Sequence, residues 1–234
     1  MKILLYALLV LIIYLGYSFL NFYKKYQVSK ALIGATAPFE ITGNNHTKTL
    51  LILGDSTGVG VGASHPEESV GGRLAKSINA TYVENHAVSG ALVRDLFPQL
   101  EKIQLPKYDV ILIQIGGNDI VRFHDAHVGA AILGEILSKL PKSARTIVLS
   151  CGDVGTATIV PHVLRGFYTE RTLMYHSAFN VVVTEHKGYY VNLYTEKVND
   201  PFYLHPEIYL AKDEFHPSGE GYGLWFSKIK NLAQ

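Results

Sequence analysis

Short apolar runs that alternate with longer, helix-like stretches limit the folds open to this chain more than any other feature. Each parallel strand needs a crossover connection, usually a helix, so this alternation predicts an α/β fold with a parallel sheet covered on both faces. The runs read TLLILG at 49–54, TYVEN at 81–85, DVILIQIG at 109–116, TIVLSCG at 146–152 and YYVNLY at 189–194. Helices are predicted near 68–79, 90–104, 126–140, 163–187 and 219–231.

The charge balance and the cysteine content exclude some classes of protein. The 234 residues suffice for one domain with a sizeable core, and the 21 basic and 20 acidic side chains nearly cancel. Because no strong field surrounds such a domain, we expect no nucleic-acid partner. The single cysteine, Cys151, cannot form an internal disulfide and lies in an apolar run, which predicts a buried, unreactive thiol.

The amino terminus differs from this pattern. Ile3 to Tyr23 is an uncharged run that Lys24 and Lys25 close, and as a helix rising ~1.5 Å per residue it can cross a ~30 Å hydrocarbon layer. A cleavable signal peptide has an apolar core of only ~7–15 residues with small residues soon after it. The nearest such stretch, Ala35-Thr36-Ala37, is far downstream. A retained single-pass anchor is therefore predicted.

These observations divide the chain into three parts: a membrane anchor over 1–23, a linker without regular structure over 24–47, and a domain over 48–234. The count of positive charges on the two sides of the anchor is nearly balanced. A two-residue tail before a long apolar run also begins many uncleaved export signals. We expect the domain on the extracytoplasmic side of the membrane.

The stretch LGDSTGVGVGASH at 53–65 follows the first predicted strand and allows two interpretations. In the first, the loop binds a nucleotide, because Gly58, Gly60 and Ala63 have the G-x-G-x-x-G/A spacing. Glu84, at the end of the next strand, stands about where an acid that binds the ribose is expected. Against this, Gly58 does not come directly after the strand, and ASHPEE separates the glycines from any helix. A pyrophosphate would then meet no helix amino terminus.

In the second interpretation, Ser56 is a nucleophile, which requires a base, an acid that orients the base, and donors for an oxyanion. The carboxyl ends of parallel strands share one edge of a sheet, so residues that follow different strands meet there. Gly90 follows the second strand and Asn118 the third. Asp213 and His216, near the carboxyl terminus with two residues between them, can form a carboxylate–imidazole pair in one turn.

The segments GDS, a lone glycine after the second strand, GGND and DEFHPS occur in this order from Leu51 to about Trp225. In this the chain resembles the SGNH hydrolases, also called the GDSL family of esterases and lipases. The resemblance implies a flavodoxin-like three-layer α/β/α sandwich and makes 48–234 an SGNH-type hydrolase domain. Thr57 stands where the family often has leucine.

The resemblance also implies a role for each motif residue. Ser56 is the expected nucleophile, His216 its general base and Asp213 the residue that orients the base. The backbone N–H groups of Ser56 and Gly90 and the side chain of Asn118 are the expected oxyanion donors. No cofactor and no metal are expected. Gly58, Gly60 and Gly62 are interpreted as slack beside the nucleophile.

We therefore predict a membrane-anchored serine ester hydrolase that acts on an acyl-ester small molecule, a lipid or an acylated glycan. Two segments, 154–168 and 201–210, are expected to shape the acyl site because they are rich in aromatic and aliphatic residues. Three alternatives stay open. They are an acyltransferase that uses the same site, a nucleotide-binding membrane module, and a catalytically silent binding domain.

Overall fold

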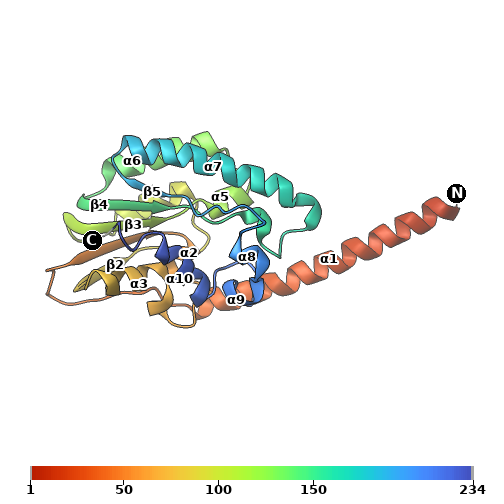
Figure 1. Cartoon of the computed structure of the whole chain (residues 1–234), viewed down its shortest axis with the longest axis horizontal. Coiled ribbons are helices and arrows are strands. Elements are labelled where there is room, and N and C mark those ends of the chain that lie inside the picture. The colour runs from red at the N-terminus through yellow and green to blue at the C-terminus, as the bar shows by residue number, and fades with distance from the viewer. Residues whose placement is uncertain (1, 233–234) are drawn as a thin grey trace.

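The computed structural model describes residues 2–232 of the chain, with ten α-helices and five strands (Figure 1). The strands are β1 (Thr49–Gly54), β2 (Tyr82–Asn85), β3 (Lys107–Gln114), β4 (Lys142–Leu149) and β5 (Tyr189–Val191). All neighbouring strands pair in parallel, in the order β2-β1-β3-β4-β5. This is the flavodoxin-like order, and the predicted parallel sheet is confirmed.

Helices cover both faces of this sheet, as Figure 1 shows, with α6 and α7 on one face and α3 and α10 on the other. The helices are α1 (Lys2–Ala35), α2 (Ser56–Val59), α3 (Val70–Ser77), α4 (Leu96–Leu100), α5 (Gly117–Val121), α6 (Ala126–Lys139), α7 (Arg165–Glu185), α8 (Pro201–Leu204), α9 (Pro206–Tyr209) and α10 (Gly219–Ser227). Short 3-10 turns lie at Pro66–Glu68, Val93–Asp95, Val154–Thr156 and His162–Leu164. The predicted three-layer arrangement is confirmed.

The central strands are apolar on both sides because both sides are covered. Leu51 and Leu53 belong to the hydrophobic cluster under α6 and α7, whereas Leu50 and Ile52 belong to the cluster under α3 and α10. All four of these β1 side chains are fully buried. Burial on alternating sides explains why the strands read as continuous apolar runs rather than as alternating ones.

One predicted helix is much shorter than expected. Residues 90–104 form only a 3-10 turn at Val93–Asp95 and the five-residue helix α4. Pro98 lacks an N–H group and its ring clashes with the carbonyl four residues earlier, so a helix tolerates it only in its first turn. The helix therefore starts at Leu96, and the prediction of a long helix here was wrong.

Helix α1 extends beyond the predicted anchor. It runs from Lys2 to Ala35 without a break, because residues 24–33 contain neither glycine nor proline. The irregular structure expected from residue 24 onward is therefore wrong up to Ala35. Beyond the helix, Ile41 forms an antiparallel bridge with Val83 and packs against the core. The second half of the expected linker thus joins the domain.

The predicted membrane anchor falls partly outside the described residues. Nothing is described of Met1 or of the side chains of Lys2–Leu5, Ala7, Val10, Leu11 and Leu15. No helix in the described part of the chain is both long enough and apolar enough to cross a membrane.

Two glycines with nearly the same backbone conformation allow a test of how tightly the end of β1 is packed. Gly54 has φ +143° and a Cβ added there would lie 2.0 Å from the Gln114 carbonyl oxygen, whereas Gly43 has φ +140° and open space around it. We expect Gly43→Ala to cost about 1–3 kcal/mol of unfolding free energy from backbone strain alone. Gly54→Ala should cost more than about 4 kcal/mol because the backbone must also move.

Urea unfolding of the two variants, with soluble yield as a second measure if Gly54→Ala fails to fold, checks this expectation. Equal losses in the two variants would contradict the close packing of β1 against β3.

Candidate active site

Ser56 lies at the carboxyl end of β1, where the strand turns sharply into α2. Asp55 caps this short helix, since its Oδ1 accepts hydrogen bonds from the Thr57 N–H at 2.9 Å and the Thr57 hydroxyl at 2.8 Å. Ser56 is the first residue of the helix and is 6 % exposed. The cap therefore fixes the serine at the edge of the sheet that the sequence predicts for chemistry.

The Asp213 carboxylate and the His216 imidazole meet Ser56 from the other end of the chain. His216 Nε2 lies 2.9 Å from Ser56 Oγ, and His216 Nδ1 lies 2.5 Å from Asp213 Oδ2. Asp213 Oδ1 accepts the backbone N–H groups of Phe215 at 3.1 Å and His216 at 3.0 Å, which closes the turn between them. Asp213 and His216 are 0 % and 4 % exposed. The structure thus joins three predicted site residues by hydrogen bonds.

Burial and hydrogen bonding act in opposite directions on Asp213. Burial alone would raise its pKa, but the hydrogen bonds and the charge of His216 outweigh burial and hold the pKa of Asp213 below its ordinary value. The carboxylate is therefore ionised at neutral pH. With a proton on Nδ1 facing this carboxylate, Nε2 is left to accept the Ser56 hydroxyl proton.

The loops that carry Asn118 and Gly90 are bound to each other. Asn118 Nδ2 donates to the Ala91 carbonyl oxygen at 3.1 Å, and Arg122 Nη2 donates to the Gly90 carbonyl oxygen at 3.3 Å. Gly90 has φ +83°, a left-handed conformation that favours glycine. Asp119 binds the same segment, because its Oδ2 accepts the Val93 N–H at 3.1 Å.

The expected oxyanion donors are not all equally close to the cavity. Asn118 lines it together with Ser56 and His216, whereas Gly90 lies outside this lining. Among the described contacts, the backbone N–H groups of Ser56 and Gly90 donate to no other group of the chain. Both N–H groups are thus available to an oxygen atom of a bound molecule.

A cavity of about 300 Å³ opens beside Ser56 and continues between the loops after β4 and β5 and helix α10. Both segments expected to shape an acyl site contribute to it, through Val154 and Ala157 and through Phe202 and Leu210. Further apolar residues of the wall could not be predicted from local patterns, because only the fold brings them together: Leu193, Leu224 and Trp225.

The lone cysteine also lines this cavity. Burial, with the nearby Asp55 carboxylate, raises the pKa of the Cys151 thiol to about 12. A thiol with this pKa stays protonated at neutral pH and is a poor nucleophile. Cys151 therefore contributes packing to the cavity wall, in line with the unreactive thiol expected from the sequence.

The glycines after Ser56 are tightly packed, so their interpretation as slack was wrong. Gly60 and Gly62 have φ +92° and +99°, where glycine avoids strain. A Cβ added to each of the three glycines would lie within 3 Å of another atom of the chain: Ala87 Cβ for Gly58, Ser69 Cβ for Gly60 and the Pro217 carbonyl oxygen for Gly62. Protein atoms thus occupy the space that a side chain would need at each of these glycines.

A pH dependence follows from Asp55. Burial, opposed by the bonds from Thr57, raises its pKa from 3.8 to about 6. Because the folded state favours the protonated acid, its stabilising contribution is complete below about pH 4 and is lost as the pH rises through 6. Asp55→Asn keeps an acceptor for Thr57 without this loss. Relative to wild type, the variant should gain up to about 3 kcal/mol of unfolding free energy between pH 4 and pH 8.

Chemical unfolding of both proteins at several pH values measures this difference. Glu207→Gln, which changes an exposed carboxylate in the same way, serves as the control. A difference between Asp55→Asn and wild type that stays constant with pH would rule out the raised pKa.

The chain is also similar in sequence to known proteins. The family model described as GDSL-like lipase/acylhydrolase matches residues 52–224. A GDSL-like esterase from Mycobacterium tuberculosis is 28% identical over 183 residues, which cover 75% of this chain and 58% of the relative. The chain thus spans less than two thirds of the length of that relative.

Solved structures share the fold at low identity. A member of the lipolytic G-D-S-L family from Veillonella parvula has a TM-score of 0.62 at 16% identity, with 80% of this chain and 98% of that chain covered. A catalytic mutant of an acetylxylan esterase from Geobacillus stearothermophilus has a TM-score of 0.60 at 18% identity, with 82% and 96% covered. At these identities the likeness concerns the fold alone.

Proposed function

The chain belongs to the GDSL-like lipase/acylhydrolase family, and we propose that it is a serine ester hydrolase that acts through an acyl-enzyme. One observation carries the proposal: the continuous hydrogen-bond chain from Ser56 Oγ through His216 to Asp213. A serine hydroxyl is a weak nucleophile unless a base takes its proton, and this chain supplies the base with the acid that orients it.

In the first half of the proposed reaction, Ser56 Oγ attacks the carbonyl carbon of an ester. His216 Nε2 takes the hydroxyl proton, and the Asp213 carboxylate stabilises the imidazolium that forms. The carbonyl oxygen becomes an oxyanion that accepts hydrogen bonds from Asn118 Nδ2 and from the backbone N–H groups of Ser56 and Gly90. When the tetrahedral intermediate breaks down, His216 returns the proton to the departing alcohol.

The second half releases the acyl group. Water donates a proton to His216 Nε2 and attacks the acyl carbon, and the intermediate collapses to a carboxylic acid and free Ser56 Oγ. His216 gives the proton back to the serine, so the enzyme ends in its starting state.

The proposed substrates are acyl esters: a small-molecule ester, a lipid or an acylated glycan. The cavity beside Ser56 has a wall that includes Val154, Leu193 and Trp225, which suits an apolar acyl group. Among the structures of similar fold, one is an acetylxylan esterase, which illustrates the glycan case.

Hydrolysis of p-nitrophenyl esters of graded chain length by the full-length chain in detergent tests this proposal. We expect Ser56→Ala and His216→Ala to abolish nearly all turnover, because each removes a member of the hydrogen-bond chain. Asn118→Ala removes one oxyanion donor and should lower kcat by about 10²–10³.

Asn45→Ala, on the exposed segment before β1, is the control and should leave turnover unchanged. Full activity in Ser56→Ala would sink the proposal. Product that forms only when a sugar or lipid alcohol is added would instead identify an acyltransferase that uses the same site.

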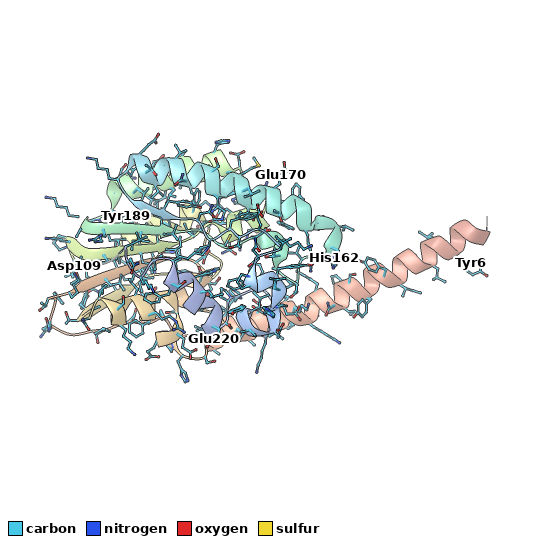
Figure 2. All side chains as sticks on the ribbon, in the orientation of Figure 1. Tyr6, Asp109, His162, Glu170, Tyr189 and Glu220 are labelled. Atoms are coloured by element: carbon cyan, nitrogen blue, oxygen red, sulfur yellow. The ribbon has the colours of Figure 1, made fainter. Side chains whose placement is uncertain are left out.

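We also propose that Ile3–Tyr23 anchors the enzyme in a membrane, with the domain on the extracytoplasmic side. Figure 1 shows the first half of α1 projecting away from the domain, and Tyr6, labelled in Figure 2, stands clear of it with 68 % of its surface exposed. Many apolar side chains along this half are more than half exposed: Leu8, Leu9, Ile12, Ile13, Phe19 and Leu20. Lipid would cover surface that is otherwise unfavourable in water.

Charges introduced into this run test the anchor. We expect the full-length chain to sediment with membranes and to need detergent for release. The double variant Leu9→Lys, Ile13→Lys should appear largely in the soluble fraction, because each lysine costs about 3 kcal/mol near the centre of a spanning helix.

Val181→Lys, at an exposed apolar position of α7, is the matched control and should stay with the membranes. Equal sedimentation of the double variant and wild type would argue against the anchor. Protease added to intact spheroplasts should digest the domain, and protection until lysis would reverse the proposed orientation.

A further inference from the structure

A lysine of α1 reaches the loop that carries Asp213 and His216. Lys25 Nζ lies 2.5 Å from Glu214 Oε2, and the Thr158 hydroxyl donates to the same oxygen at 2.5 Å. The Lys25 side chain is only 16 % exposed and that of Glu214 is 42 % exposed. Three segments far apart in the sequence therefore meet at one carboxylate: helix α1, the loop after β4 and the turn that holds the base.

Glu214 occupies the centre of that turn in an unfavourable conformation. It has φ +57°, in the left-handed region that costs a residue other than glycine about 1–3 kcal/mol. Its neighbours on both sides, Asp213 and Phe215, are joined by the hydrogen bond that closes the turn, and its own N–H donates to the Ala211 carbonyl oxygen at 2.8 Å. Contacts that fix the Glu214 side chain therefore help to hold the backbone on which Asp213 and His216 are mounted.

Lys25 is held in place by more than this ion pair. The half-buried positions in the second half of α1 recur at helical spacing, at Lys25, Val28, Ser29 and Leu32. These residues lie on one face of the helix, which is the face turned toward the domain. Figure 1 shows the corresponding half of α1 passing beside the domain, whereas the first half extends away from it. The docked face fixes where the Lys25 ammonium group can reach.

We propose that Lys25 and Glu214 are positioning residues through which α1 holds the Asp213–His216 turn in line with Ser56, so that ester hydrolysis depends on the docking of α1. The inference rests on the proposed hydrolase function. Neither residue lines the cavity beside Ser56, and both act through the geometry of His216. Thr158 extends the same contact to the cavity, because its neighbour Ala157 lines the wall beside Ser56.

An ordinary surface ion pair contributes about 0–1 kcal/mol. The pair of Lys25 and Glu214 differs because the Lys25 side chain is mostly buried and Thr158 donates a second hydrogen bond to the carboxylate. Burial would raise its pKa, but the hydrogen bonds from Lys25 and Thr158 outweigh burial and lower the pKa of Glu214. The carboxylate thus stays charged at neutral pH. Two other carboxylates lie near this turn: Asp213 pairs with His216, and Asp55 interacts with the charge of His216.

Two adjacent lysines of α1 provide a matched pair of variants for the test. Lys24 is exposed and forms no ion pair among the described residues. Lys25→Ala should lower kcat by about 10- to 100-fold, because a small displacement of the base is costly in rate, while KM and the urea midpoint stay close to wild type. Lys24→Ala removes the same charge from the same helix and should leave kcat unchanged. Lys25→Arg should restore most of the rate, and Glu214→Gln should reproduce the loss.

A second measurement does not depend on turnover. The Nδ1 proton of His216 should give a low-field resonance in the proton NMR spectrum of wild type and Lys24→Ala, and that resonance should broaden or shift upfield in Lys25→Ala. Equal kcat and equal spectra for Lys24→Ala and Lys25→Ala would overturn the proposal, as would a loss of rate that follows the urea midpoint. Inactivity of wild type toward all esters would instead count against the hydrolase function, and the spectra would still decide whether α1 positions the turn.

Discussion

The hydrogen bonds around the Asp213 carboxylate are the interaction on which the rest of the site depends. One oxygen closes the turn through two backbone N–H groups, and the other faces the imidazole of His216. The same group thus sets both the shape of the turn and the orientation of the ring. This arrangement is stable only because a fully buried carboxylate has all of these partners, since an unpaired buried charge would be strongly destabilising.

On the serine side, hydrogen bonds hold the end of β1 and the loop that faces this turn. Gln99 binds both backbone groups of Gly54 at 2.8 Å, and the Asn85 amide donates to the Gly58 carbonyl oxygen at 3.0 Å. Gly62 lies against Pro217, directly after His216. The glycines after Ser56 therefore allow close packing between the serine loop and the histidine loop. These glycines provide room for close contact between the two loops rather than flexibility.

The sequence was sufficient to predict the sheet and to predict that Ser56, Asp213 and His216 meet at its edge. Buried parallel strands leave long apolar runs, and residues that follow such strands converge at one edge of the sheet, so local patterns there carry tertiary information. Two of the wrong predictions have local causes: the helix continues through 24–33 because no glycine or proline interrupts it, and Pro98 limits the helix expected at 90–104. Packing decides only at Gly58 to Gly62, where no local pattern shows the neighbouring atoms. No local pattern could have revealed a contact between Lys25 and Glu214, which are 189 positions apart.

The unbroken course of α1 has a consequence for the distance between the cavity and a lipid surface. A helix of 34 residues is about 50 Å long, and if Ile3–Tyr23 spans the bilayer, only one further residue separates the span from Lys25. With no flexible tether between them, the Asp213–His216 turn would then be held at the height of the lipid headgroups. This fixed distance would restrict the enzyme to esters within the adjacent leaflet or just above it, rather than those that diffuse far from the membrane.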